Sequence, residues 1–299
     1  MSKSNPGKNL IVAAVQLRPQ NSLEENLASA EALIQRAVDS GSQLLVLPEN
    51  FAYLGRKDLA EVGLTEQTAA GPVRRFLANQ ARRHAIWLVG GTIPVTATES
   101  TAAADAAQSD TLKSGNAQSS KPVARSLLFN PRGEEVAHYD KIHLFDADVS
   151  AKSQQQKQYR ESDDYRAGGD IVVADADLCR LGMTVCYDLR FAELYRQLAD
   201  NNAQIICAPA AFTAATGRDH WELLLRARAV ENQVFMIGAN MVDRDHPRRG
   251  LWGGSAIVDP WGTLLAKVDD QVGVAIAEID LDRLVDVRQK MPIRQHRKL

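Results

Sequence analysis

The chain is poor in cysteine. Its 299 residues include three, Cys179, Cys186 and Cys207, and their spacings do not repeat. An odd number of cysteines without paired spacing provides neither a disulfide framework nor a Cys-x-x-Cys metal site. His-Glu-x-x-His and related zinc-binding spacings are also missing from the sequence, so we expect no bound metal.

The chain also lacks a charge excess and a long apolar run. Its 35 Lys and Arg residues balance 37 Asp and Glu residues, whereas a nucleic-acid-binding domain usually carries a clustered basic excess. No apolar run approaches the roughly 18 residues that cross a bilayer. Gln16, Arg18 and Pro19 follow the first apolar stretch without a small-residue cleavage site. We therefore expect a cytoplasmic protein with reduced thiols that binds neither nucleic acid nor membranes.

The hydrophobic pattern alternates between strands and helices. Strands are predicted at 10–17, 44–47, 86–89, 126–130, 135–139, 183–185, 204–208 and 234–238. Helices are predicted after a capping box of Ser22 and Glu25, from Pro72 to residue 83, and at 191–199 and 219–231. Wholly apolar strands such as 205–207 suit a sheet that is covered on both faces, which predicts an α/β fold.

No repeat or linker divides the sequence, and we expect one domain over residues 1–299. Residues 96–120 interrupt the pattern, because alanine, serine and threonine predominate there and aromatic residues are missing. Such a composition buries little apolar surface, which predicts a surface insertion between two strands.

Cys186 is the first candidate for chemistry, because it follows an apolar stretch and precedes a predicted helix. The carboxyl end of a strand is where α/β proteins bind ligands. Free N–H groups of the following helix would lower the pKa of the thiol and could bind an oxyanion. A buried, inert thiol is the alternative for any single cysteine, and it suits Cys207 in its apolar strand. Cys179 falls in a predicted turn.

Glu49 and Lys141 also lie at the ends of predicted strands. A carboxylate held at the poorly hydrated entrance of a site has a raised pKa and suits proton transfer. A solvated loop carboxylate fits the position of Glu49 equally well. Lys141 lies among apolar and aromatic residues, where its ammonium could stabilise an oxyanion or a thiolate. The common alternative is that the side chain extends from a sheet edge into solvent.

Glu49, Lys141 and Cys186, in this order, resemble the Glu–Lys–Cys triad of the nitrilase superfamily of carbon–nitrogen hydrolases. The resemblance runs from Val12 to about Lys298 and implies a four-layer α-β-β-α sandwich. The insertion at 96–120 and a long gap between Lys141 and Glu161 depart from the family pattern and concern the entrance to the site. The resemblance depends on the motifs Leu47-Pro48-Glu49, Lys141-Ile-His-Leu-Phe-Asp146, Cys186-Tyr-Asp-Leu-Arg-Phe191, His220-Trp-Glu-Leu-Leu-Leu-Arg-Ala-Arg228 and Val258-Asp-Pro-Trp-Gly262.

The resemblance implies that Cys186 is the nucleophile, Glu49 the general base and then acid, and Lys141 the oxyanion stabiliser. Glu161 matches a second family glutamate, which orients the lysine and balances its charge. The thiol attacks an amide carbonyl, and we expect the backbone N–H of Tyr187 to bind the oxyanion as well. The amine leaves and water hydrolyses the thioester, with no metal or organic cofactor.

The residues after the cysteine narrow the substrate. True nitrilases of the superfamily typically continue with Trp-Glu, whereas Cys186-Tyr-Asp-Leu-Arg-Phe resembles the branch of ω-amidases and deaminated glutathione amidases. The resemblance implies a small amide substrate with a remote carboxylate, cleaved to acid and ammonia. A carboxylate needs a cation or convergent donors in the pocket.

Four residues are expected to contact this substrate: Tyr187, Arg190, Phe212 and Thr213. An ion pair of Arg190 with Asp188 or Glu193 is the structural alternative for the arginine.

Other interpretations stay open. The chain could hydrolyse nitriles or simple aliphatic amides, or it could be a Cys–His thiol hydrolase with His143 or His220 as the base. A non-catalytic scaffold is less consistent with the sequence, because no triad residue is lost. Family members usually pair through helices near the nucleophile, so the resemblance implies a homodimer or a higher homo-oligomer.

Overall fold

The computed structural model describes residues 9–96, 121–149, 157–245 and 250–298. Apart from Thr96, the predicted insertion at 96–120 lies outside these described residues.

In the described part of the chain, seven strands form the first sheet, in the order β17-β1-β2-β3-β5-β4, with β6 also paired to β5. The central strands β1, β2 and β3 are parallel, and the others join in antiparallel fashion. The strands are β1 (Asn9–Gln16), β2 (Leu44–Val46), β3 (Trp87–Val89), β4 (Ile93–Val95), β5 (Val123–Phe129), β6 (Glu135–Asp140) and β17 (Gly273–Asp280).

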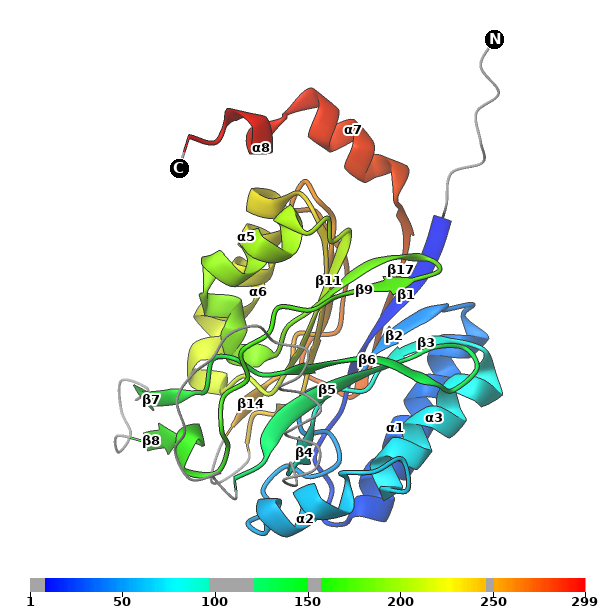
Figure 1. The fold of residues 1–299 in the computed structure, drawn as a ribbon, viewed down its shortest axis with the longest axis vertical. Helices are drawn as coiled ribbons and strands as arrows, with labels where there is room; N and C mark the ends of the chain where they lie inside the picture. Colours follow the sequence, from blue (N-terminus) through cyan, green and yellow to red (C-terminus); the bar gives the residue numbers. More distant parts are fainter. Residues whose placement is uncertain (1–8, 97–120, 150–156, 246–249, 299) are drawn as a thin grey trace.

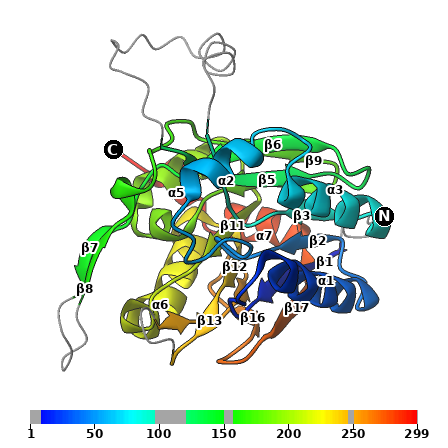
Figure 2. The same ribbon diagram turned by 90° about the horizontal axis from the view of Figure 1, so that it is seen from below.

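The second sheet has six strands in the order β16-β15-β12-β11-β10-β9, within the same described ranges. Its central strands β10, β11 and β12 are parallel. The strands are β9 (Val173–Ala176), β10 (Cys179–Met183), β11 (Ile205–Ala210), β12 (Phe235–Asn240), β15 (Ala256–Val258) and β16 (Leu264–Lys267). Two short pairs complete the β structure: β7 (Asp146–Val149) with β8 (Lys157–Arg160), and β13 (Val242–Asp243) with β14 (Leu251–Trp252). The β7–β8 hairpin stands out from the body of the molecule in Figures 1 and 2.

The helices form the two outer layers (Figure 1). Helices α1 (Leu23–Asp39) and α3 (Pro72–His84) cover the first sheet, and α5 (Ala192–Asp200) and α6 (Ala214–Asn232) cover the second. The two sheets pack against each other between these layers, so the predicted four-layer α-β-β-α sandwich is confirmed. The remaining helices are α2 (Leu59–Thr65), α7 (Asp282–Lys290) and α8 (Ile293–His296).

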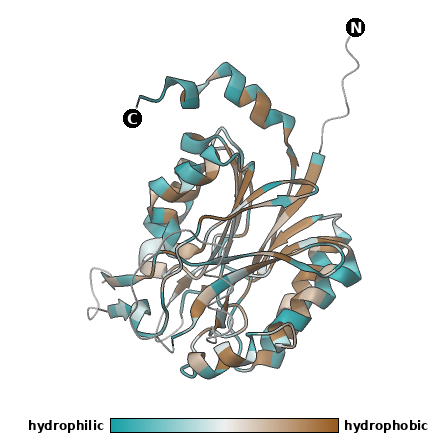
Figure 3. Cartoon of the chain, in the orientation of Figure 1, coloured by the Kyte–Doolittle hydropathy of each residue, from teal (hydrophilic) through white to brown (hydrophobic). Residues whose placement is uncertain are grey.

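The alternating direction of the side chains along the strands explains why each sheet is covered on both faces. In β1, Val12 and Ala14 belong to the hydrophobic cluster between the sheets. Ala13 and Val15 point the other way, into the cluster shared with α1 and α3. Because successive side chains of a strand face opposite sides, a strand apolar at every position is buried on both faces. Figure 3 shows the central strands as mainly hydrophobic and the outer helix surfaces as largely hydrophilic.

Several predicted boundaries agree with the structure. Ser22 and Glu25 form the capping box of α1, and Pro72 is the first residue of α3. Helix α6 begins at Ala214, earlier than predicted, because the Thr213 side chain accepts a hydrogen bond from the N–H of Thr216 and caps the helix.

One prediction about the cysteines is wrong. Cys179 lies in β10 rather than in a turn, because it pairs with Ala176 across a tight hairpin and so begins the strand. That strand ends at Met183, before the predicted stretch 183–185 is complete.

Among the helices that the structure describes, none has the length and apolar character needed to cross a membrane.

Candidate active site

Glu49 is held at the end of β2 by a tightly built turn. Gly91 has a φ of +59° and lies against the carbonyl oxygen of Pro48, where a side chain would collide. Asn50, with a φ of 54°, donates its backbone N–H to the Thr92 hydroxyl at 2.9 Å. These contacts fix the backbone on both sides of Glu49, whose side chain is buried between the sheets.

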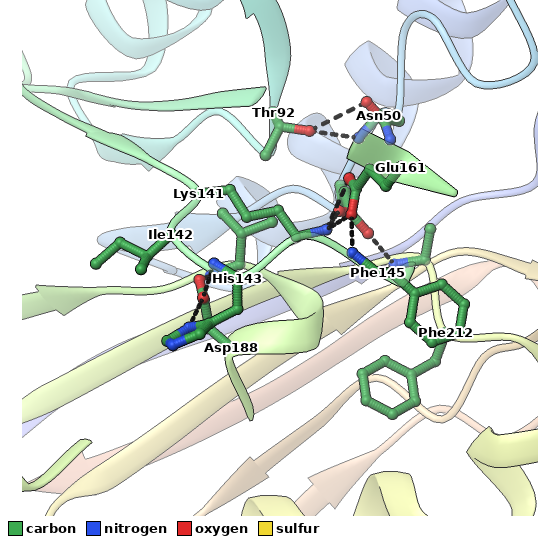
Figure 4. A network of polar contacts seen from close by, with 12 residues as sticks. Asn50, Thr92, Lys141, Ile142, His143, Phe145, Glu161, Asp188 and Phe212 are labelled. Carbon is green, nitrogen blue, oxygen red and sulfur yellow. Dashed lines mark hydrogen bonds and ion pairs between the residues drawn. The ribbon is translucent and has the colours of Figure 1, made fainter. Parts of the chain in front are cut away.

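Lys141 follows β6 and turns its side chain into the interior. Its backbone is held on both sides, because its N–H donates to the Ala124 carbonyl at 3.0 Å and its own carbonyl accepts from Gly168 at 2.8 Å. The side chain is only 1% exposed. Its Nζ donates to Glu49 Oε1 at 2.8 Å. It also donates to the two Glu161 carboxylate oxygens at 2.9 and 2.8 Å, as Figure 4 shows from close by.

Glu161 is the second carboxylate that contacts the Lys141 ammonium. It directly follows β8 and begins a short 3₁₀ helix, Glu161–Asp163. One carboxylate oxygen also accepts the backbone N–H of Phe145 at 2.6 Å (Figure 4). Burial alone would lower the pKa of Lys141, but the negative charges of Glu161 and Glu49 raise it well above its usual value. Lys141 is therefore a permanent ammonium.

Cys186 is the first residue of a second 3₁₀ helix, Cys186–Arg190, and it adopts the left-handed backbone region with a φ of 47°. A residue other than glycine in this region is strained by about 1–3 kcal/mol and is held there by its surroundings. Its side chain is buried, with 7% of the residue exposed.

The prediction that the pKa of this thiol is lowered is wrong. Burial, and then the charge of Glu49 and a hydrogen bond to it, raise the pKa of Cys186 well above its usual value. Lys141 and the N–H of Ala211 act in the opposite direction without reversing the shift. A five-residue 3₁₀ turn that begins at Cys186 separates the thiol from the predicted helix, which is α5, and such a short turn presents a much weaker dipole to the thiol. The resting group is a thiol.

Glu49 joins the two sheets at this point. Its Oε2 accepts the N–H of Ala211 at 2.9 Å, and Ala211 directly follows β11 of the second sheet. The structure therefore brings together Glu49, Lys141, Glu161 and Cys186 from four separate segments of the chain.

A cavity of about 230 Å³ opens at these four residues. It is smaller than the roughly 300–1,000 Å³ of pockets for drug-sized ligands, which favours a small substrate. The sequence did not reveal most of the residues that line this cavity, although several of them are close in sequence to Glu49 or Glu161. These missed lining residues are Asn50, Tyr53, Arg56, Phe145, Tyr159, Arg160, Asp164 and Tyr165.

The four predicted substrate contacts gather on the other side of the Cys186 thiol. Tyr187, Arg190, Phe212 and Thr213 line a narrow hollow of about 10 Å³ together with Cys186. Cys186 and Phe145 border both hollows, so the thiol lies between them.

Arg190 makes neither of the ion pairs considered for it. No carboxylate contacts its guanidinium within the described residues, and its Nη1 lies 3.2 Å from Nδ1 of His220. The guanidinium also lies over the rings of Tyr187 and Phe212, at 5.7 and 5.3 Å from their centroids. Burial lowers the pKa of Arg190, but arginine is so basic that the group stays charged. The expected partner Asp188 is already occupied by other donors.

The histidines are engaged elsewhere. His143 Nδ1 bonds to Asp188 at 2.7 Å and its ring is stacked on Phe191, whereas His220 contacts Arg190. The group that hydrogen-bonds to the thiol is a carboxylate, which does not fit a Cys–His hydrolase. Within the ranges that the structure describes, no three His, Cys, Asp or Glu side chains are grouped to hold a metal ion.

The other two cysteines are free and buried. Burial raises the pKa of Cys179 to about 12 and that of Cys207 well above its usual value. Both are inert thiols of the hydrophobic core, as expected for Cys207.

Comparison with known proteins gives a consistent result. The carbon–nitrogen hydrolase family profile matches residues 11–289. The chain is 39% identical over 289 residues to the deaminated glutathione amidase of Yersinia enterocolitica, covering 97% of this chain and 93% of that protein. It is 33% identical over 283 residues to the human omega-amidase NIT2, covering 94% and 92%.

Two solved structures share the fold. The Saccharomyces cerevisiae protein Nit3, a member of branch 10 of the nitrilase superfamily, aligns with a TM-score of 0.80 at 28% identity, covering 98% of both chains. The Caenorhabditis elegans NitFhit protein aligns with a TM-score of 0.80 at 32% identity, and here the chain spans 98% of its own length but 65% of the NitFhit chain.

The raised thiol pKa predicts how Cys186 reacts with iodoacetamide. Only the thiolate reacts, so alkylation should rise with pH and have its midpoint above the value of about 8.5 for an ordinary cysteine. Glu49→Gln removes a negative charge that raises this pKa, so the midpoint should move down. Peptide-level mass spectrometry distinguishes Cys186 from the other two cysteines. A midpoint at or below 8.5 in the unmodified protein would contradict the assignment.

Proposed function

The chain belongs to the carbon–nitrogen hydrolase family of the nitrilase superfamily, and we propose that Cys186 forms a thioester with the acyl part of a small, carboxylate-bearing amide. The enzyme is a hydrolase of non-peptide carbon–nitrogen bonds, and its activity is that of an amidase. The observation that supports this site most strongly is the Lys141 ammonium, shared by Glu49 and Glu161 beside the buried thiol.

The first half of the reaction begins from a protonated thiol. Glu49 accepts the Sγ proton while the sulfur forms a bond to the amide carbonyl carbon. The oxyanion is stabilised by Lys141 and by the N–H of Tyr187, in the first turn of the 3₁₀ helix, where N–H groups lack partners within the helix. Glu49 then gives its proton to the nitrogen, the C–N bond breaks, and ammonia or an amine leaves.

The second half removes the acyl group. Glu49, again ionised, takes a proton from water as the water oxygen attacks the thioester carbonyl. The C–S bond breaks, the free acid leaves, and the proton returns to the sulfur. The charges of the side chains suffice for both halves, and the proposal includes no metal or organic cofactor.

Arg190 is proposed to bind the remote carboxylate of the substrate. It lies beside the thiol, is partly removed from water, and has no carboxylate partner in the part of the chain that the structure describes. The arginines of the larger cavity are each engaged already, Arg56 with Asp58 and Arg160 with Asp148. Phe212 and Thr213 complete the rim, and the relatives named deaminated glutathione amidase and omega-amidase support an amide of this class.

The outer face of α6 supports a homodimer as a further part of the proposal. Leu223 and Trp261 are 65% and 56% exposed and line one surface groove with Val230. Large apolar side chains grouped on a surface are typical of an interface. We expect residues 1–299 to act as one domain within this dimer, and the free cysteines are consistent with a reducing, cytoplasmic setting.

Replacement of the base tests the mechanism. Glu49→Gln should lower turnover at least about 100-fold, because proton transfer by a placed side chain contributes at least that much. The assay measures acid and ammonia or amine from α-ketoglutaramate, deaminated glutathione, an aliphatic amide and a nitrile. Cys186→Ala should abolish turnover, and Glu134→Gln, at an exposed carboxylate, should leave it unchanged. Wild-type turnover by Glu49→Gln would exclude Glu49 as the base.

Removal of the proposed anchor tests substrate recognition. Arg190→Met should raise KM at least about tenfold for carboxylate-bearing amides, because a hydrogen bond to a charged group contributes about 1.5–3 kcal/mol. KM for a neutral primary amide should stay within about twofold of wild type, since that substrate makes no such bond. Arg56→Met is the matched comparison in the larger cavity. A KM increase in Arg56→Met and none in Arg190→Met would assign the carboxylate to the other side of the thiol.

Light scattering tests the dimer. The unmodified protein should have at least twice the mass of one chain, and Leu223→Glu should shift it toward the monomer because it places a charge in an apolar contact. Leu64→Glu, at a leucine of α2 that is 54% exposed, is the control and should leave the mass unchanged. A monomeric unmodified protein would refute this part of the proposal.

A further inference from the structure

Asp188 is a buried carboxylate that the reaction steps do not use. Its Oδ1 accepts the backbone N–H of His143 at 3.1 Å and contacts the Nδ1 of the same residue at 2.7 Å. Its Oδ2 accepts the Tyr139 hydroxyl at 2.8 Å and the N–H of Val185 at 2.9 Å. Figure 4 shows Asp188 directed at both the backbone and the ring of His143. All four donors converge on one carboxylate with no solvent exposure.

These donors belong to two different segments of the site. Tyr139 and His143 lie two residues before and two residues after Lys141. Val185 directly precedes Cys186, and the N–H of Asp188 itself donates to the Val185 carbonyl at 3.0 Å. Asp188 therefore fastens the backbone that carries the nucleophile to the backbone that carries the ammonium.

The strained backbone of Cys186 needs such a restraint. A φ of 47° persists in a residue other than glycine only where neighbouring contacts prevent relaxation. Asp188 holds the peptide on the N-terminal side of Cys186 through both its carboxylate and its own N–H. If the turn relaxed, the thiol would move relative to Lys141 and Glu49, which are fixed by other contacts.

We propose that Asp188 is a positioning residue, which holds the Cys186 turn against the Tyr139–His143 segment so that the thiol faces the Lys141 ammonium. In this arrangement His143 carries its proton on Nδ1 and supports Asp188, with its ring stacked on Phe191 at 3.6 Å between centroids. The proposal depends on the roles of Cys186 and Lys141 given above.

A carboxylate is the only common side-chain group of this size that accepts hydrogen bonds at both of its terminal atoms. In asparagine, one end is an NH₂ group, which would face either the Tyr139 hydroxyl and the Val185 N–H or the two donors of His143. Asp188→Asn should therefore release one of the two segments, although the side chain keeps its size.

Two tyrosines provide a matched pair of variants. Tyr139→Phe removes one donor to Asp188 and also the oxygen that accepts the N–H of Ile142, at 3.3 Å, within the same segment. Tyr195→Phe removes the same atom from an equally buried tyrosine, whose hydroxyl bonds to Thr184 at 2.9 Å and does not connect the two segments. Both changes leave a buried group without its hydroxyl partner, so both should lower the urea midpoint of unfolding.

The positioning role predicts a difference between these variants in kinetics. Per titrated Cys186, kcat should fall about tenfold in Tyr139→Phe and about 100-fold in Asp188→Asn, because small misplacements of reacting groups cost about that much. KM should change less than kcat, since Arg190 also contacts His220 and Phe212, outside the two segments that Asp188 joins. Tyr195→Phe should keep its kcat within about twofold of wild type.

Alkylation of Cys186 by iodoacetamide at a fixed, mildly alkaline pH gives a readout independent of amide turnover. Burial and Glu49 raise the thiol pKa more than Lys141 lowers it, so a thiol displaced from this cluster should react faster in Tyr139→Phe and Asp188→Asn. General loosening of the core would speed the reaction in Tyr195→Phe as well, whereas the positioning role predicts the wild-type rate in that variant. If Tyr139→Phe and Asp188→Asn keep the wild-type kcat per thiol, or if Tyr195→Phe is alkylated as fast as Tyr139→Phe, the positioning role is refuted. If Asp188→Asn does not fold, Tyr139→Phe alone decides between these outcomes. Absence of amidase activity in the wild type would refute the proposed function, whereas the alkylation rates would still test the positioning role.

Discussion

The site depends on one ammonium group that has been taken out of water. Lys141 Nζ is almost inaccessible and contacts two carboxylates, those of Glu49 and Glu161. A buried charge is costly unless it is paired and fully hydrogen-bonded, and removal of one partner leaves the other uncompensated. The turn after β2, the end of β6 and the start of the 3₁₀ helix at Glu161 must therefore meet for the chain to fold stably around this residue. The proposed catalytic geometry and the folding of this region depend on the same contacts.

The charges of this cluster also explain why a protonated thiol is suitable. Glu49 and Glu161 contribute two negative charges and Lys141 one positive charge, so a thiolate at Cys186 would add a second uncompensated negative charge in a buried place. Transfer of the thiol proton to Glu49 avoids this, because the negative charge moves from oxygen to sulfur and the total stays constant. Sulfur can then form its bond to carbon without an extra charge in the low-dielectric interior.

Residue type and position in the sequence predicted which groups form the candidate site, but they did not predict the electrostatics of these groups. Glu49, Lys141 and Cys186 could be found because each lies just beyond the end of a predicted strand, a position where α/β proteins place ligands. The direction of the Cys186 pKa shift could not be found, because it depends on burial and on Glu49, which lies in the other sheet. The lining residues Tyr53, Arg56 and Tyr159 were missed for a similar reason, since the loop after β2 and the β7–β8 hairpin close the cavity together. Hydrophobic periodicity carries no information on how such separate segments meet.

The two-sheet architecture has a consequence for the proposed nucleophile and its proposed base. Glu49 comes from the first sheet, whereas Cys186 and Ala211 follow strands of the second. The hydrogen bond from Ala211 to Glu49 thus crosses the interface between the sheets, at the edge of the hydrophobic cluster that holds them together. Close-packed interiors transmit small displacements, so the distance between base and thiol is set by packing along the whole interface, including residues such as Val12 and Val46 that contact no reacting group. In this fold the hydrophobic core is what aligns the acid–base chemistry.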